Sequence, residues 1–106
     1  MTDVRLAITT MASNLEARRL AHALVEEKLA ACVNILHAAE SVYRWRGAVQ
    51  TSQEWMLLIK TTEARLPAVK TRLIELHAYE LPEFLVIAPD SGDAAYFAWI
   101  ADSVRH

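Results

Sequence analysis

Residues 31–60 read ACVNILHAAESVYRWRGAVQTSQEWMLLIK, two apolar, strand-forming arms on either side of Gly47. Glycine adopts the positive backbone angles that tight hairpin turns require, so Gly47 marks the turn of a β-hairpin. Each arm would reach about 14 residues, against a usual strand length of about 5 or 6. Arms that overrun a small sheet expose unpaired edges. The length of the hairpin therefore predicts contacts with other subunits.

Hydrophobic periodicity predicts the elements on both sides of this hairpin. Ser13 and Glu16 form a capping-box pair at the start of the first helix, and Thr61 or Thr62 is expected to cap the second. The expected elements are a strand at residues 4–9, a helix at 15–28, the hairpin, a helix at 66–76, a strand at 84–88 and a helix at 93–104. Within the second arm of the hairpin, the apolar run at 55–59 is expected to be buried on both faces. This βαββαβ order with an appended C-terminal helix predicts a ferredoxin-like α+β fold.

Length and composition limit the kind of protein. The 106 residues predict a single domain, residues 1–106, and the 54% hydrophobic content indicates apolar surface hidden between subunits. The net charge of −2, without a basic stripe, argues against nucleic acid as a partner. A single cysteine, Cys32, excludes an intrachain disulfide and fits a reducing compartment. No signal peptide or membrane span is visible, so we expect no membrane contact.

Residues 77–83, HAYELPE, bring an imidazole, a phenol and two carboxylates together just before an apolar run. Pro82 restricts the backbone and makes the loop rigid. Histidine titrates near neutral pH and is the commonest metal ligand in proteins. The loop is thus either a functional site at the mouth of a strand or a connector whose polar groups satisfy backbone donors.

The metal-ligating residues are sparse. The chain has Cys32 and four histidines, without CxxC, HxH or HExxH spacing: His22, His37, His77 and His106. On an unbroken strand Cys32 and His37 point to opposite faces. His77, together with Glu80, Tyr79 or groups from a neighbouring chain, is the remaining candidate for a weak divalent-cation site, which would bind Cu²⁺ most tightly. Cys32 is either a soft copper ligand or a packed apolar residue.

Tyr43 and Trp45 alternate with Arg44 and Arg46, which predicts aromatic side chains on one face of the strand and arginines on the other. The aromatic face is either an anchor between subunits or, with Tyr79 and Lys60, the wall of an inter-subunit pocket for a small anion. A catalytic hypothesis would use His77 as a base oriented by Glu80. No nucleophile with a placed base accompanies it, so we expect a binding protein and not an enzyme.

Four blocks carry a family resemblance: EKLAACVNI at 27–35, SVYRWRG at 41–47, LIKTT at 58–62 and HAYELPE at 77–83. Together they resemble the signature blocks of CutA, the divalent-cation tolerance proteins. The resemblance implies a cytoplasmic ferredoxin-like homotrimer, similar in architecture to PII signalling proteins, that binds copper or another divalent cation and has no secure enzymatic activity. The alternative is a PII-like signalling or scaffold trimer that acts through a protein partner, with metal binding incidental.

The chain departs from common patterns of that family. His37-Ala38 replaces Pro-Gly, Ala78 replaces a proline, and Arg46 stands where an acidic residue is frequent. Thr9 and Leu76 occupy positions where some members have a copper-binding cysteine and a second histidine. A copper site built from that cysteine and a histidine pair cannot form here.

Overall fold

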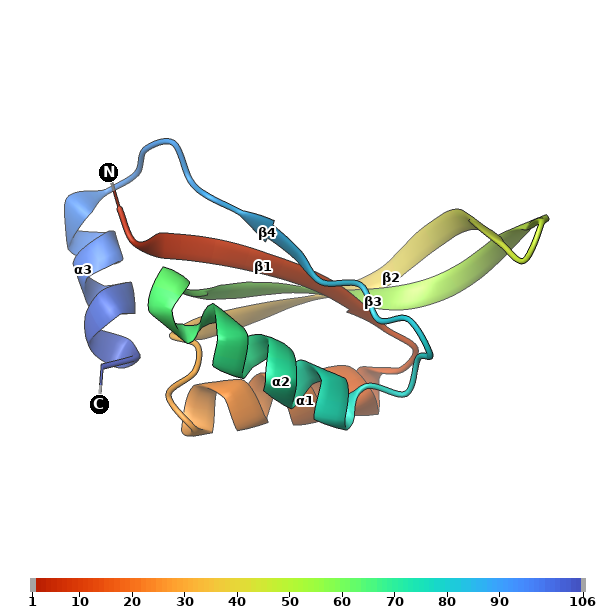
Figure 1. Cartoon of the computed structure of the whole chain (residues 1–106), viewed down its shortest axis with the longest axis horizontal. Helices are drawn as coiled ribbons and strands as arrows, with labels where there is room; N and C mark the ends of the chain where they lie inside the picture. The colour runs from red at the N-terminus through yellow and green to blue at the C-terminus, as the bar shows by residue number, and fades with distance from the viewer. Residues whose placement is uncertain (1, 106) are drawn as a thin grey trace.

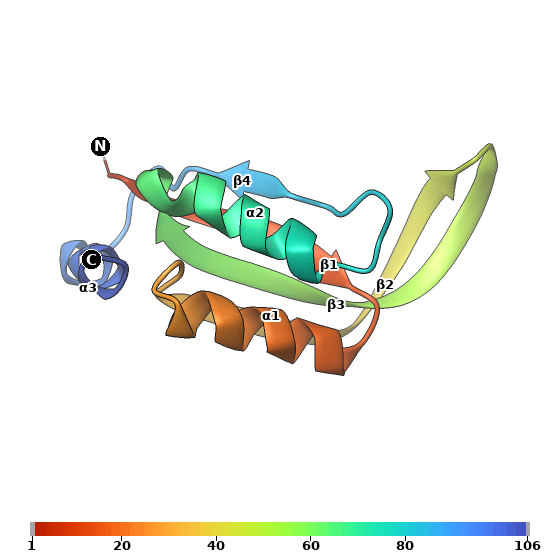
Figure 2. The ribbon, with the colours of Figure 1, turned by 60° about the horizontal axis from the view of Figure 1, so that its bottom comes forward.

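The computed structural model describes residues 2–105, in which two helices cover one face of an antiparallel sheet and a third lies at its end (Figures 1 and 2). The elements are β1 (Val4–Met11), α1 (Asn14–Glu26), β2 (Cys32–Trp45), β3 (Ala48–Thr62), the 3₁₀ turn η1 (Glu63–Arg65), α2 (Leu66–Leu76), β4 (Leu85–Ile87) and α3 (Ala94–Ser103). The strand order is β2-β3-β1-β4, with every pair antiparallel. The predicted ferredoxin-like α+β fold with a C-terminal helix is confirmed. His106 lies outside the described residues.

The predicted capping pair starts α1. The backbone N–H of Glu16 donates to the Ser13 hydroxyl over 3.2 Å, and that hydroxyl donates to the Glu16 carboxylate over 3.0 Å. The carboxylate thus reaches back to the hydroxyl and closes the cap. The helix then buries an apolar stripe at three- and four-residue spacing against the sheet: Ala17, Leu20, Ala21 and Leu24.

The prediction that Thr61 or Thr62 caps the second helix is wrong. The Thr61 side chain faces the helix layer, and its hydroxyl donates to the Leu29 carbonyl over 2.6 Å. Thr62 makes no capping hydrogen bond with its side chain, and η1 separates both threonines from α2. α2 starts after Arg65 with Pro67 in its first turn, where the missing N–H costs no helical hydrogen bond.

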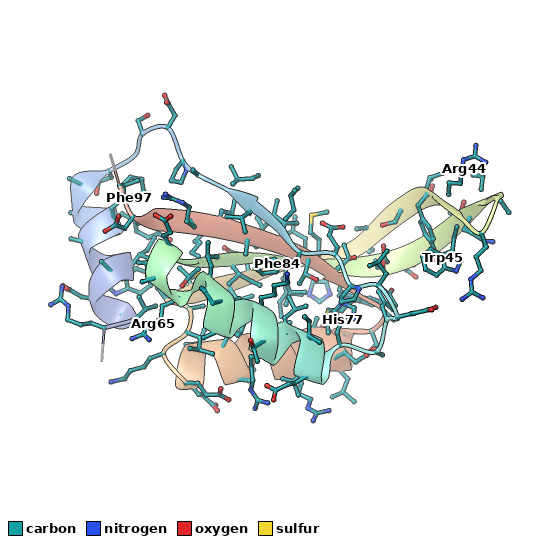
Figure 3. The ribbon with its side chains drawn as sticks, viewed as in Figure 1. Arg44, Trp45, Arg65, His77, Phe84 and Phe97 are labelled. Atoms are coloured by element: carbon teal, nitrogen blue, oxygen red, sulfur yellow. The ribbon has the colours of Figure 1, made fainter. Side chains whose placement is uncertain are left out.

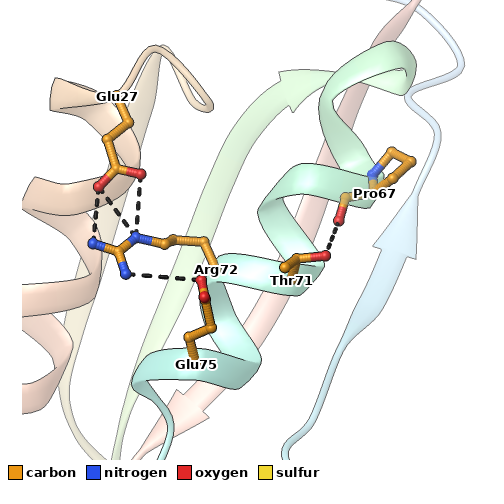
Figure 4. A network of polar contacts seen from close by, with 5 residues as sticks. All are labelled: Glu27, Pro67, Thr71, Arg72 and Glu75. Carbon is orange, nitrogen blue, oxygen red and sulfur yellow. Dashed lines mark hydrogen bonds and ion pairs between the residues drawn. The ribbon is translucent and has the colours of Figure 1, made fainter.

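An ion-pair network joins the two helices on the covered face. The guanidinium of Arg72 in α2 donates to both carboxylate oxygens of Glu27, just after α1, over 3.0 and 3.1 Å, and lies 3.8 Å from Glu75 (Figure 4). The hydrogen bond with Glu27 raises the pKa of Arg72. A planar guanidinium bound through two nitrogens also fixes direction, so the network aligns the two helices.

The long hairpin is confirmed, with arms of 14 and 15 residues. It ends in Arg46 and Gly47, whose φ angles of 50° and 81° form the type I′ turn that matches strand twist. Between Leu36 and Ala39 two residues of β2 oppose one of β3, and Ala38 takes a φ of 58°. This bulge bends the hairpin, whose outer half leaves the sheet and extends the molecule to 44 Å (Figure 1).

The sheet has one covered and one open face. Residues such as Ala7, Leu57 and Ile59 face α1 and α2 and are fully buried. The alternate residues form what we call the open face: Leu6, Ile8, Leu36, Met56, Leu58, Leu85 and Ile87. Within residues 2–105 the 55–59 run is thus buried on one face only, because α1 and α2 both lie on the same side of the sheet (Figure 2).

α3 lies at the end of the sheet beside the N-terminus (Figure 1). The Asp93 carboxylate caps it by accepting the N–H of Tyr96 over 3.0 Å, and Ile100 is buried. The guanidinium of Arg65 donates to the Val104 carbonyl over 2.8 Å and ties the end of the helix to η1. Over residues 2–105 we find no helix with both the length and the hydropathy to cross a membrane.

Candidate functional site

A cleft of about 880 Å³ lies between the outer half of the hairpin and the loop that follows α2. We call it the hairpin cleft. The hairpin supplies its aromatic wall and the loop its opposite wall. Its lining residues are Thr10, Ser41, Val42, Tyr43, Trp45, Glu54, Ala78, Tyr79, Glu80, Leu81, Pro82 and Glu83. Most of the loop that the sequence singled out therefore faces one cavity.

His77 anchors the start of this loop (Figure 3). Its Nε2 lies 2.7 Å from the carbonyl oxygen of Thr10, and its Nδ1 accepts the backbone N–H of Tyr79 over 3.1 Å. A carbonyl only accepts and an amide N–H only donates, so the ring is neutral with its proton on Nε2. Both ring nitrogens are engaged, and a metal ion would have to displace one of these bonds. The geometry favours the connector interpretation of His77.

Tyr79 and Glu54 form the floor of the cleft. The phenol donates to the Glu54 carboxylate over 2.7 Å, and Glu54 is only 7% exposed. Burial, and then the hydrogen bond with Glu54, raises the pKa of Tyr79 well above its usual value. In residues 2–105 Glu54 makes no ion pair with a lysine or arginine. A carboxylate buried without a cation is costly, which makes this position favourable for an added positive charge.

Two further carboxylates line the cleft. Partial burial at the cleft, and then repulsion from Glu54, raises the pKa of Glu83. Glu80 pairs with Arg46 of the hairpin turn over 2.9 Å. The cleft thus has negative character, which favours a cation over the small anion considered from the sequence. Sequence reasoning missed Glu54 and named Glu83 only as one carboxylate of the loop at residues 77–83; the signal for Glu54 was an acidic residue directly before the apolar 55–59 run.

The predicted pocket residues are only partly brought together. Tyr43, Trp45 and Tyr79 line the same cleft. Lys60 does not, since it pairs with Leu6 and Cys32 near the opposite end of the sheet and its ammonium lies 5.7 Å from the centre of the Tyr96 ring. In a single chain Lys60 therefore belongs to the surroundings of α3.

The three predicted metal ligands are also separated. Cys32 pairs across the hairpin with Lys60, whereas His77 bonds to Thr10, whose partner is Met56. Four residues of strand separate these positions by about 13 Å. The Cys32 thiol is partly exposed on the open face and lies 3.9 Å from the Asn34 amide oxygen. Among residues 2–105 no three His, Cys, Asp or Glu side chains converge as a metal-ligand set.

Fold and cleft together define a small ferredoxin-like α+β protein in which an overlong hairpin walls an acidic cleft. The family model described as CutA1 divalent ion tolerance protein matches residues 5–103. The chain belongs to this CutA1 family, so the resemblance seen in the four sequence blocks is confirmed.

Individual relatives agree with this assignment. The divalent-cation tolerance protein CutA of Thermus thermophilus is 42% identical over 98 residues, which cover 92% of this chain and 95% of that protein. The chloroplastic protein CutA 1 of Oryza sativa is 44% identical; the match covers 87% of this chain and 52% of that longer protein. The crystal structure of CutA from Xylella fastidiosa superposes with a TM-score of 0.95 at 40% identity, over 98% of this chain and 100% of that one.

Proposed function

We propose that this chain is a cytoplasmic homotrimer that serves metal-ion tolerance by binding, not by catalysis, and that the hairpin cleft takes up a divalent cation. Membership of the divalent ion tolerance family supports the role. The observation that carries the site is the buried Glu54 carboxylate, which faces a cleft with two more carboxylates and has a phenol as its hydrogen-bond partner. A bound cation supplies the positive charge that this position favours.

The donor atoms in the cleft are of a chemical type that binds divalent cations. Carboxylate oxygens from Glu54, Glu80 and Glu83 suit divalent cations, and among first-row ions the affinity of such a site is greatest for Cu²⁺. The carboxylates do not form a closed ligand set within one chain, so we expect groups of a neighbouring subunit to complete it. Cys32 lies outside the cleft, and any copper that it binds occupies a separate, open-face position.

The trimer is supported by apolar surface that one chain leaves uncovered. On the open face Leu85 and Ile87 are 55% and 44% exposed, and on the outer hairpin Val42 and Val49 are each 64% exposed. Apolar surface that a single chain leaves exposed in this way is typical of an interface. Sedimentation equilibrium at low micromolar concentration tests the assembly; the mass of a single 11.9 kDa chain would refute it. Trp45→Ala should weaken the trimer by about 2 kcal/mol, the usual cost of truncating an interface aromatic.

Calorimetric titration with Cu²⁺ tests the site. Glu54→Gln and Glu83→Gln should each lower the affinity at least tenfold, or about 1.4 kcal/mol. The matched control is Asp90→Asn, which removes one carboxylate from the loop between β4 and α3 and should leave the affinity unchanged. Equal Cu²⁺ affinities in the parent and in all three variants would exclude the hairpin cleft as the cation site.

The same titration decides whether His77 is a metal ligand or a structural connector. Because both ring nitrogens make hydrogen bonds, we expect His77→Ala to lower the melting temperature and to leave the Cu²⁺ affinity close to that of the parent. A tenfold loss of affinity with unchanged stability would instead make His77 a direct ligand, as the sequence suggested.

A further inference from the structure

The hairpin leaves the sheet at one residue of β3, Trp55. Trp55 pairs with Met11 at the end of the β1–β3 register, and beyond this point the hairpin continues as two strands (Figure 1). Toward β2, the bulge between Leu36 and Ala39 leaves Trp55 outside the regular pairing of the described register. A two-stranded ribbon has little stability of its own, so the contacts at this junction decide how firmly the outer hairpin is held.

A side-chain hydrogen bond crosses the bulge. The indole N–H of Trp55 donates to Nδ1 of His37, which lies in the bulge, over 3.3 Å. An indole nitrogen only donates, so Nδ1 carries no proton and the ring is neutral with its proton on Nε2. The partly buried Trp55 side chain packs against the core of the sheet. This bond therefore ties the bulge to the core.

The bond depends on the protonation state of His37. Imidazole takes up a proton between about pH 8 and 5, and a protonated Nδ1 donates and no longer accepts. His37 is exposed, so protons from the solvent reach its ring. The contact is therefore present at neutral pH and is lost as the pH falls.

The surrounding elements offer no ion pair to the protonated ring. In β2 the nearby acidic residue is the exposed Glu40; in β3 it is Glu54, which alternates with Trp55 and accepts the Tyr79 hydroxyl on the opposite face. The charged side chains of α1, which packs on both strands, are Glu16, Arg18, Arg19, His22 and Glu26. Across residues 2–105 none of these groups forms an ion pair or hydrogen bond with His37. Protonation thus breaks the bond without replacing it.

We propose that His37 is a pH-sensitive element of the hairpin: its neutral ring holds the Trp55 indole and fixes the bend, and protonation releases the bulge. The outer hairpin forms one wall of the hairpin cleft, so the bend sets how closely that wall approaches the loop after α2. The outer hairpin is therefore held firmly at neutral pH and loosely in mild acid. This inference does not depend on a cation in the cleft, because it rests on a contact at the bulge.

Three substitutions isolate the contact. His37→Asn places a side-chain oxygen near the position of Nδ1, and this oxygen accepts the Trp55 N–H without titrating. Trp55→Phe keeps an aromatic ring and removes the donor. His22→Asn is the matched control, because His22 is another exposed histidine, with its ring 3.9 Å from Glu26 of the same helix.

Hydrogen exchange of the full chain, measured as amide protection factors at about pH 7.5 and about pH 5.5, tests the inference across the histidine titration range. In the parent, residues 36–40 and 53–56 should lose protection about two- to tenfold at the lower pH relative to α1, the range that one hydrogen bond contributes. His22→Asn should show the same loss. His37→Asn should keep its protection at both pH values, and Trp55→Phe should show the reduced protection at both.

Two results would overturn the role of His37. One is a parent whose bulge keeps full protection at the lower pH. The other is an equal loss in His37→Asn, which would assign the pH dependence to another group, such as His77. Melting temperatures at neutral pH verify that each variant is folded, and if Trp55→Phe does not fold, the comparison of His37→Asn with the parent still decides.

Discussion

The Tyr79 hydroxyl donates a 2.7 Å hydrogen bond to the Glu54 carboxylate across 25 residues of sequence. Tyr79 belongs to the loop after α2, and Glu54 to β3, where the hairpin leaves the sheet. The bond therefore ties the two walls of the hairpin cleft at its floor. It also supplies a partner to a carboxylate that is almost fully buried.

Tyr79→Phe should destabilise the protein. The substitution keeps the ring and removes the donor, so Glu54 is left buried with one hydrogen bond fewer, at a cost of about 1–3 kcal/mol. Tyr43→Phe is the matched control, because the Tyr43 hydroxyl bonds to Ser52 on an exposed face. Urea unfolding at equal protein concentration compares the two. Similar losses of unfolding free energy in both variants would show that the hydrogen bond to Glu54 contributes no more than an exposed one.

Ala38→Gly should stabilise the protein. Ala38 holds a φ of 58° at the hairpin bulge, a left-handed conformation that costs a residue with a Cβ about 1–2 kcal/mol. Glycine removes most of that strain. The neighbouring Ala39→Gly, in regular strand conformation, should instead cost about 0.5–1 kcal/mol. Thermal melting should show a higher melting temperature for Ala38→Gly and a lower one for Ala39→Gly. A lower melting temperature in Ala38→Gly would mean that packing of the Ala38 methyl group outweighs the backbone strain.

Thr9→Val and Thr61→Val should shift stability in opposite directions. Both threonines are fully buried, but among residues 2–105 the Thr9 hydroxyl has no hydrogen-bond partner, whereas Thr61 donates to the Leu29 carbonyl. Valine at position 9 removes an unsatisfied polar group and should gain about 1 kcal/mol, while valine at 61 should lose about 1–3 kcal/mol. Urea unfolding of both variants measures these changes in the free energy of unfolding. A loss at position 9 would reveal a partner for its hydroxyl.

Glu83 should make stability depend on pH. Its pKa in the folded protein is raised above the ordinary 4.5, so the folded state holds the proton more tightly than the unfolded state. Its contribution is complete below the unfolded pKa and is lost as the pH rises through the higher folded value. Glu83→Gln should flatten this part of the stability curve. The effect is modest because the side chain is exposed, and Asp90→Asn provides the comparison.

Local patterns identified much of the fold. The Ser13–Glu16 cap depends on residues three apart, and the Gly47 turn on adjacent ones, so both could be predicted. The alternation of Tyr43 and Trp45 placed both aromatics on the wall of one cleft. Alternation failed at Arg46 because a strand rule no longer holds once the backbone enters a turn. Thr61 does not cap the second helix because its hydroxyl donates to the Leu29 carbonyl, which comes from another segment of the chain.

The sequence by itself determined the order of elements, the overlong hairpin and the family, since these depend on short-range periodicity and contiguous motifs. Only the tertiary structure decided the site. His77 bonds to Thr10 across 67 residues, Glu54 meets Tyr79, and Lys60 lies far from the cleft to which it was assigned. The physical reason is strand register and loop placement: chain segments distant in sequence decide which polar groups meet, and no local pattern carries that information.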